Sequence, residues 1–295
     1  MKKTLASALV ILFLLPSGVA RAQEPARDEW APVARALGRA GEERDGVYRV
    51  PFPRSDLRVR LGGVNIRTTL ALTSWMAFQK AGEATMVMGD LVLLTAEVAP
   101  VVSQLVAAGI EVTAVHNHLL GEQPRVMYLH FHGHGDAAQL AAALRSALAR
   151  TGTPLATPRP HPGSDATALD AGQLSKILGH AGTPRVGIVA FTIPRAEKIT
   201  GGGAELGPRM GLGTAINFQA EGSGAATTGD FVLLASEVQP VIRALREHGI
   251  EVTALHNHML DEQPRLFFLH FWGRGPAEKL AADLRAALDQ TSHAR

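Results

Sequence analysis

The feature that most constrains the fold is an internal duplication. Residues 89–135 match residues 229–275 at an offset of 140, with about 29 of the 47 positions identical. Upstream, residues 33–41 match residues 174–182 at an offset of 141. This period is too long for a solenoid repeat, so the sequence predicts two copies of one domain rather than an array. We place repeat 1 at residues 33–150, a proline-rich linker at 151–173 and repeat 2 at 174–290.

Residues 1–22 have the pattern of a secretory signal peptide. Two lysines precede an apolar run from Leu5 to Leu15, and a small-x-small cleavage motif ends at Ala22. After it, no run reaches the roughly 18 consecutive apolar residues that a bilayer-spanning helix needs. We therefore expect an exported, soluble protein, periplasmic or secreted. The chain has no cysteine, which excludes disulfides, thiolate ligands and a lipidated cysteine as a stable membrane anchor.

The charge of the predicted mature chain is close to neutral. The full sequence has 29 basic and 27 acidic residues, and the signal peptide carries three of the basic ones, so 26 and 27 remain and the net charge is −1. Nucleic-acid binding needs clustered lysine and arginine side chains for phosphate contacts, and the sequence has no such cluster. We therefore exclude nucleic acid as a partner.

Each repeat mixes strands and helices. Alternating apolar and β-branched residues predict strands, and glycine-terminated or amphipathic segments predict helices. The predicted fold class is α+β: two homologous repeats, each a mainly antiparallel sheet with two or three helices and a histidine-rich β-hairpin. In repeat 1 we expect strands at 47–52, 57–66, 69–78, 86–94, 110–120 and 125–134, and helices at 33–37, 98–108 (capped by Thr95 or Ala96) and 137–150.

Eight of the 12 histidines fall in one predicted hairpin per repeat. A lone half-buried histidine is usually a hydrogen-bonded structural residue, but this clustering points to a site. Imidazoles that face one another repel when protonated, so an ion, a carboxylate or a ligand has to hold them. The hairpin histidines are His116, His118, His130, His132 and His134 in repeat 1, and His256, His258 and His270 in repeat 2.

The strand period predicts which face these rings share. From Ile110 to His118 every second residue lies on one face, which begins apolar and ends with His116 and His118. If a loop of about five residues joins the strands, His116 lies opposite His130, and a shift by two residues places His118 there instead. Either register brings three or four imidazoles within the roughly 5–8 Å reach of cross-strand neighbours.

Imidazoles combined with a carboxylate suit a divalent transition metal ion, and we expect zinc first. Glu122 and Glu262 in the connecting turns are predicted as ligand or base, and His130 and His270 as further catalytic residues. Without an ion the same side chains suit general acid–base catalysis, because imidazole titrates near neutral pH. The predicted metal ligands are His116, His118, His130, His132, His256, His258 and His270.

Other polar residues near the hairpins have structural interpretations that we favour. Asp90 and Asp230 are possible extra ligands, but a turn or capping role is favoured. Asn117 and Asn257 point to the opposite face, as structural hydrogen bonders. Arg125 and Arg265 are expected to pair with the turn glutamates rather than to clamp an anionic substrate. The copies also differ, since Trp272 and Arg274 replace His132 and His134.

The hairpin motifs resemble those of a known family. Residues 109–120, Gly-Ile-Glu-Val-Thr-Ala-Val-His-Asn-His-Leu-Leu, and residues 125–135, with their counterparts at 249–260 and 265–275, are similar to the LppY/LpqO family of bacterial exported proteins. The resemblance covers nearly the whole predicted mature chain and implies export. It implies no activity, cofactor or catalytic residue, because the family is a domain of unknown function.

The sequence therefore predicts an exported protein that binds a transition metal through its histidine-rich hairpins, in one composite site or in two. A metal-dependent hydrolase or lyase is one hypothesis. The alternatives are a non-enzymatic cell-envelope protein that binds a glycan, peptide or small molecule, and a periplasmic metal carrier. The sequence predicts no oligomeric state.

Overall fold

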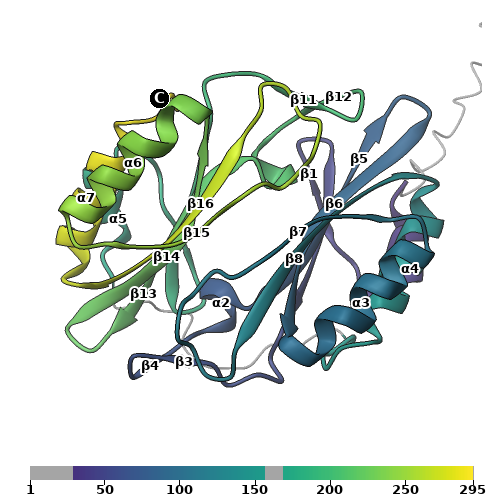
Figure 1. Ribbon diagram of the computed structural model, residues 1–295, viewed down its shortest axis with the longest axis horizontal. Coiled ribbons are helices and arrows are strands. Elements are labelled where there is room, and N and C mark those ends of the chain that lie inside the picture. Colours follow the sequence, from purple (N-terminus) through teal and green to yellow (C-terminus); the bar gives the residue numbers. More distant parts are fainter. Residues whose placement is uncertain (1–28, 157–168, 295) are drawn as a thin grey trace, which may run out of the picture.

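The computed structural model describes residues 29–156 and 169–294. The predicted signal peptide and the central part of the predicted linker lie outside these residues. The described part consists of two α+β repeats that face each other (Figure 1). None of its helices combines the length and apolar character needed to cross a membrane.

Each repeat is built on a six-stranded antiparallel sheet, and the two sheets have the same strand order, β1-β2-β5-β6-β8-β7 in repeat 1 and β9-β10-β13-β14-β16-β15 in repeat 2. The first sheet contains β1 (Glu42–Arg44), β2 (Val47–Pro53), β5 (Thr73–Ala81), β6 (Ala84–Leu94), β7 (Glu111–His116) and β8 (Val126–Gly135). The second contains β9 (Thr183–Arg185), β10 (Ile188–Pro194), β13 (Gly213–Glu221), β14 (Gly224–Leu233), β15 (Glu251–His256) and β16 (Phe267–Gly275).

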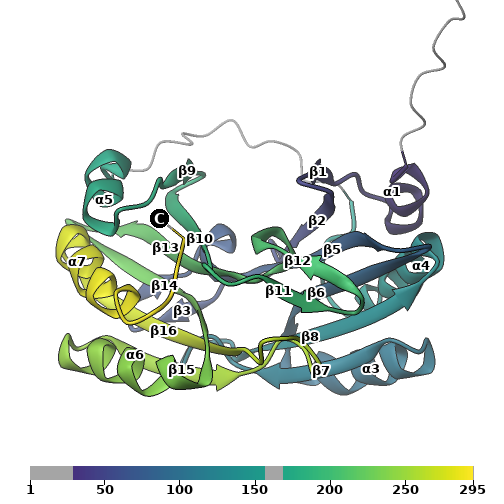
Figure 2. The same cartoon turned by 90° about the horizontal axis from the view of Figure 1, so that it is seen from above.

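Helices cover the outer face of each sheet, so that the inner faces look toward each other (Figure 2). Because side chains alternate along a strand, Leu129 and Phe131 of β8 point outward and join the buried core beneath the helices, while His130 between them points inward. The helices are α1 (Ala31–Leu37), α3 (Thr95–Ala107) and α4 (Ala137–Leu148) in repeat 1, and α5 (Ala171–Leu178), α6 (Ala235–Glu247) and α7 (Ala277–Leu288) in repeat 2.

One segment of each repeat lies outside the six-stranded sheet and packs on the other repeat. We call these two segments the excursions. Gln219 of β13 accepts a hydrogen bond from the Arg67 backbone N–H at 2.9 Å and donates one to the Asn65 carbonyl at 2.8 Å. Gln79 of β5 likewise donates to the Glu205 carbonyl at 2.8 Å. The excursions are β3 (Arg60–Leu61), β4 (Val64–Asn65) and α2 (Thr68–Ala71) in repeat 1, and β11 (Ile199–Gly201), β12 (Ala204–Leu206) and the 3₁₀ helix η1 (Pro208–Met210) in repeat 2.

These excursions bury apolar residues of both repeats together. Leu70 and Val92 share one core with Ile188 and Trp272. A second mixed core joins residues of β5 and β6 to residues of β11, β12 and β14. The two repeats therefore form a single packed unit.

Most predicted elements occur, with three corrections. Residues 57–66 are not one strand, because Gly62 and Gly63, with φ of 53° and 89°, turn the chain between the short β3 and β4. The predicted strand 69–78 begins with helix α2 and is extended only from Thr73. Helix α3 starts at Thr95, and its N-terminus is capped by the Glu97 carboxylate, which accepts a 2.8 Å bond from the Leu94 N–H, rather than by Thr95 or Ala96.

Candidate metal centre

The ends of β7 and β15 are joined across the boundary between the repeats. Thr113 Oγ1 donates to the His258 carbonyl at 2.6 Å, and Thr253 Oγ1 donates to the His118 carbonyl at 2.6 Å. Asn117 Nδ2 donates to the Thr253 carbonyl at 2.8 Å, and Asn257 Nδ2 donates to the Thr113 carbonyl at 2.9 Å. The structural role predicted for both asparagines is confirmed. These four bonds hold the two histidine-bearing strand ends beside each other.

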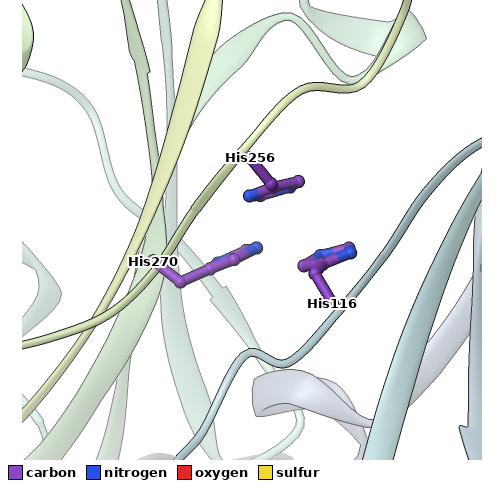
Figure 3. A group of neighbouring side chains, drawn as sticks. All are labelled: His116, His256 and His270. Atoms are coloured by element: carbon purple, nitrogen blue, oxygen red, sulfur yellow. The ribbon is translucent and has the colours of Figure 1, made fainter.

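Six histidines converge at this seam, three from each repeat. We call His116, His118, His130, His256, His258 and His270 the histidine cluster. The rings of His116 and His256 stack at 3.8 Å between centroids. His118 stands 3.7 Å from His270, and the matching pair His130 and His258 stands 3.8 Å apart. These near-equal distances show that the two repeats contribute equivalent histidines to the cluster. Figure 3 shows three of the rings, with His116 of repeat 1 beside His256 and His270 of repeat 2.

Both predicted hairpin registers are wrong. His130 lies opposite Ala114, and His116 lies opposite Tyr128. A β-bulge between Val112 and Ala114 interrupts the alternation on which the register prediction depended. His118 comes after the last residue of β7. Ile110 and Val112 therefore pack in the core beneath the helices and do not share the face of His116 that the strand period predicts for them. The bulge places His116 on the inner face with His130, with 4.8 Å between the ring centroids.

Backbone contacts fix the orientation of two of the rings. His130 Nδ1 lies 3.0 Å from the Gly89 carbonyl, and His270 Nδ1 lies 2.7 Å from the Gly229 carbonyl. A carbonyl oxygen only accepts, so each Nδ1 carries the proton and donates it. The Nε2 atom of each neutral ring therefore carries a lone pair and not a proton. Histidines that bind metals are commonly oriented by such a second hydrogen bond.

Ring nitrogens in the histidine cluster lie at the spacing of metal ligands. His116 Nε2 and His118 Nε2 are 3.1 Å apart, and His256 Nε2 and His130 Nε2 are 3.3 Å apart. In a tetrahedral zinc site, ligand nitrogens stand about 3.3 Å from one another, because each Zn–N bond is about 2.0–2.1 Å long. The buried cluster nitrogens that have no hydrogen-bond partner among the described residues include His116 Nδ1, His256 Nδ1 and His270 Nε2.

Two groups of three rings bring one ligand atom each to within 4.8 Å of one another. The first is His116, His256 and His270, and the second is His130, His256 and His258. Both groups draw on both repeats and share His256, so a metal held by either group links the two halves of the chain.

Burial is the largest cause of a lowered pKa in all six rings. It lowers the pKa of His258 to about 3. Neighbouring imidazoles lower the pKa of His116 further, since adjacent cations repel. The rings are therefore neutral at pH 7, the form in which imidazole binds a metal.

Two carboxyls adjoin the cluster on its inner side. Asp90 Oδ2 lies 3.4 Å from His118 Nε2, and Asp230 Oδ2 lies 3.1 Å from His258 Nε2. Burial raises the pKa of Asp90 well above its usual range, and the charge of Asp230 raises it further. Burial also raises the pKa of Asp230 to about 6. The structure thus places these residues in the middle of β6 and β14 beside the rings, not in the turn or capping position that we favoured from the sequence.

The predicted catalytic glutamates are engaged in their turns. Glu122 is fully buried and accepts a 3.0 Å bond from the Val126 N–H, and Glu262 accepts a 2.9 Å bond from the Leu266 N–H. Arg125 and Arg265 approach them at 3.6 and 3.4 Å, as expected for the salt-bridge interpretation. A role for Glu122 or Glu262 as ligand or base stays a prediction.

His132, also predicted as a ligand, lies one inward-facing position beyond His130 on β8. Its Nδ1 is 3.6 Å from a Glu111 carboxylate oxygen, and its ring meets His134 edge-on at 4.7 Å. Within the described residues, neither of the two ligand groups includes His132. Its role as a ligand stays a prediction.

A cavity of about 500 Å³ lies between the two inner faces and reaches the histidine cluster. This volume is within the roughly 300–1,000 Å³ range of small-molecule sites. Its walls come from β2, β5 and β6 of repeat 1 and from β10, β13 and β14 of repeat 2. The cluster side is formed by His118, His130, His258, His270, Asp90 and Asp230. No local sequence motif marks the cavity walls, so their residues are not among the predicted site residues.

Fold and site together define a two-repeat α+β protein with a histidine-lined candidate metal centre between its repeats. Residues 31–150 and 172–290 each match the family described as Domain of Unknown Function (DUF1259), and the chain belongs to this family. No curated protein matches the chain. Among solved structures, a trimeric bacterial microcompartment shell protein, PduB, matches with 14% identity over 85% of this chain and 90% of that chain. The TM-score is 0.22, so this match carries no argument.

Proposed function

We propose that this protein binds a divalent transition metal ion, zinc in the first place, in the histidine cluster, and that it is an exported metal-dependent hydrolase or lyase. The observation that carries the proposal is the convergence of His116, His256 and His270. Each of these rings has a buried nitrogen without a hydrogen-bond partner among the described residues, and their ligand atoms lie within 4.8 Å of one another. Unpartnered polar atoms are costly to bury, and a bound ion removes that cost.

The donor set favours a transition metal over calcium or magnesium. Imidazole suits zinc, copper, iron and nickel, whereas the hard cations prefer oxygen ligands. A bound ion of this kind polarises oxygen-containing groups and lowers the pKa of water.

The side chains around the cluster have separate roles in this proposal. The backbone carbonyls of Gly89 and Gly229 orient His130 and His270 as ligands. Asp230, with its pKa of about 6, holds or releases a proton 3.1 Å from His258 Nε2. Glu122 and Glu262 stabilise the turns that precede β8 and β16.

The cavity favours an enzyme or a ligand-binding protein over a metal carrier. A carrier needs only the ion, while a cavity of about 500 Å³ against the cluster admits an organic molecule as well. A cell-envelope protein that binds a glycan, peptide or small molecule without turning it over is the second candidate, and the same cavity supports it.

Export and the resemblance to the LppY/LpqO family belong to the same proposal. They are supported by the lysine-led apolar run at residues 1–22 and by the paired hairpin motifs at 109–120 and 249–260. Cell fractionation of the native host tests export: the chain should be found outside the cytoplasm and begin at Gln23.

Metal content tests the central claim. Protein purified without a histidine tag is loaded with zinc, desalted and analysed by inductively coupled plasma mass spectrometry. We expect at least one equivalent in wild type and less than 0.1 equivalent in His116→Ala/His256→Ala. The exposed His248, which pairs with Asp283 at 3.2 Å, provides the control variant His248→Ala with wild-type content.

A milder variant separates ligand loss from misfolding. His270→Gln keeps a polar side chain of similar length, and its circular dichroism should match wild type while its zinc content falls. Equal metal content in wild type and both cluster variants would refute the metal centre. Turnover of ester, amide or lyase substrates that zinc restores to chelated wild type would separate an enzyme from a binding protein.

A further inference from the structure

The cavity has one cationic and aromatic wall, and this wall is present in one repeat only. The Arg49 guanidinium carbon lies 3.8 Å from the centre of the Trp75 ring. Both residues line the cavity, Arg49 from β2 and Trp75 from β5. The register equivalents in repeat 2 are Ala190 and Ala215, and Ala215 lines the opposite side. The histidine cluster is thus symmetric, whereas the space in front of it is not.

Within the described part of the chain, no carboxylate lies within ion-pair distance of Arg49. Asp90, which lines the same cavity, raises the pKa of Arg49 only from longer range, and burial raises the pKa of Asp90 itself well above its usual range. Arg49 Nη1 donates to the Arg209 carbonyl at 2.9 Å, and neither Arg49 nor the exposed Arg185 forms an ion pair with a described residue. Arg209 reaches only the exposed Glu42, at 3.7 Å. Burial and the nearby charges of Arg209 and Arg185 lower the pKa of Arg49 to about 9, so the guanidinium remains charged at pH 7. A cation held among other cations in a cavity attracts an anion.

The cationic wall is close to the histidine cluster. Trp75 pairs with Asp90, and Asp90 pairs with His130, so these residues form one row across three strands. The Cα atoms of Trp75 and His130 are therefore roughly 10 Å apart, two strand spacings.

The surroundings of Gly211 also show that Trp75 lies close to the histidine cluster. A methyl group at this glycine would stand 2.7 Å from Trp75 Cη2 and 3.8 Å from His258 Nδ1. The indole and a cluster imidazole therefore flank the same backbone position. A small molecule bound at Arg49 and Trp75 reaches the cluster without leaving the cavity.

We propose that the cavity binds a small organic anion, whose carboxylate or phosphate group pairs with Arg49 and whose apolar part lies against Trp75, with its opposite end facing the histidine cluster. The proposal names the substrate class of the function proposed above and rests on it. A guanidinium stacked on an indole is fixed in orientation, which suits bidentate recognition of a planar carboxylate or a phosphate. Arg185 at the exposed end of the cavity attracts the anion from solution.

Benzoate and phenyl phosphate serve as anionic probes, with benzamide as the neutral equivalent of benzoate. Binding is measured by isothermal titration calorimetry on zinc-free and zinc-loaded protein. We expect both anions to bind zinc-free wild type and benzamide to bind at least tenfold more weakly. In Arg49→Met the dissociation constants of the anions should rise at least tenfold, since a hydrogen-bonded charge partner is lost.

The controls distinguish this proposal from the metal centre. Arg274→Met removes an arginine that bonds the Gly62 carbonyl outside the cavity, and it should bind the anions as wild type does. Zinc content should be unchanged in Arg49→Met. Zinc content and anion affinity are measured independently, so a failure of the metal centre can be told apart from a failure of anion binding. Equal affinity for benzamide, equal affinity in Arg49→Met, or absence of anion binding up to millimolar concentration would each overturn the proposal.

Discussion

The six imidazoles of the histidine cluster, which are buried or half-buried, make the metal-free protein sensitive to mild acid. Their pKa values are lowered in the folded state, so the unfolded chain binds more protons as the pH falls, and folding stability falls with it. Between pH 6.5 and 5.5, an unfolded histidine with a pKa near 6.5 takes up protons that the buried ring does not, which costs about 1 kcal/mol per ring. The six rings together cost about 5–6 kcal/mol, because Asp230 and the Gly229 carbonyl oppose the lowering of the His270 pKa.

The two buried aspartates act in the opposite direction. Their raised pKa values let the folded state bind protons that the unfolded state leaves free, so their contribution is present at low pH and is lost as the pH rises through the folded pKa. As the pH falls from 6.5 to 5.5, protonation of Asp90 and Asp230 together raises the free energy of unfolding by about 2 kcal/mol. The free energy of unfolding should therefore fall by about 3–4 kcal/mol from pH 6.5 to 5.5, a large share of the roughly 5–15 kcal/mol of a typical domain.

Urea denaturation followed by circular dichroism, in the presence of a chelator at pH 6.5, 6.0 and 5.5, measures this loss. His116→Gln/His256→Gln removes two of the six titrating rings, so its loss over the same interval should be about 1–2 kcal/mol. A free energy of unfolding that is constant or higher at pH 5.5, or an equal loss in wild type and the double variant, would refute this reasoning.

Three further predictions concern the metal, a buried arginine and the seam between the repeats. Zinc at 100 times its dissociation constant should stabilise wild type by about 2.7 kcal/mol in the same denaturation assay and leave His256→Ala unchanged. Arg54→Met, which leaves the carboxylates paired with Arg54 at 2.7 and 2.9 Å uncompensated, should cost about 3–5 kcal/mol, whereas the exposed Arg58→Met should cost less than about 0.5 kcal/mol. Thr253→Val removes the 2.6 Å bond to the other repeat and should lower the unfolding free energy by about 1–3 kcal/mol; an unchanged midpoint would show that this bond does not contribute.

The sequence predicts those parts of the fold that follow from local pattern. The duplication shows in the matching of residues 89–135 with 229–275. Strand β2 shows in its alternation of buried and more exposed residues, and β6 in its run of mostly apolar residues. The excursion at residues 57–72 is predicted as strands from the sequence, whereas its apolar residues are buried in a core to which distant segments of both repeats contribute. When distant parts of the chain bury a segment, its apolar residues need not follow the regular spacing of a strand or a helix.

The site was predicted in its residue types but not in its geometry. The histidines could be found because imidazoles rarely cluster without a function. Their register could not, because the bulge near Thr113 depends on how β7 pairs with β8. Arg49 and Trp75 are 26 positions apart in the sequence, and only the pairing of β2 with β5 brings them together.

The presence of both repeats in one chain affects the orientation in which a small molecule binds in the cavity. Two identical subunits related by a twofold axis would offer Arg49 and Trp75 twice, and the small molecule would have two equivalent poses. Here the counterparts are Ala190 and Ala215, so the small molecule has only one favoured direction. Two repeats in one chain can thus differ on the cavity walls while the histidines that they contribute remain equivalent.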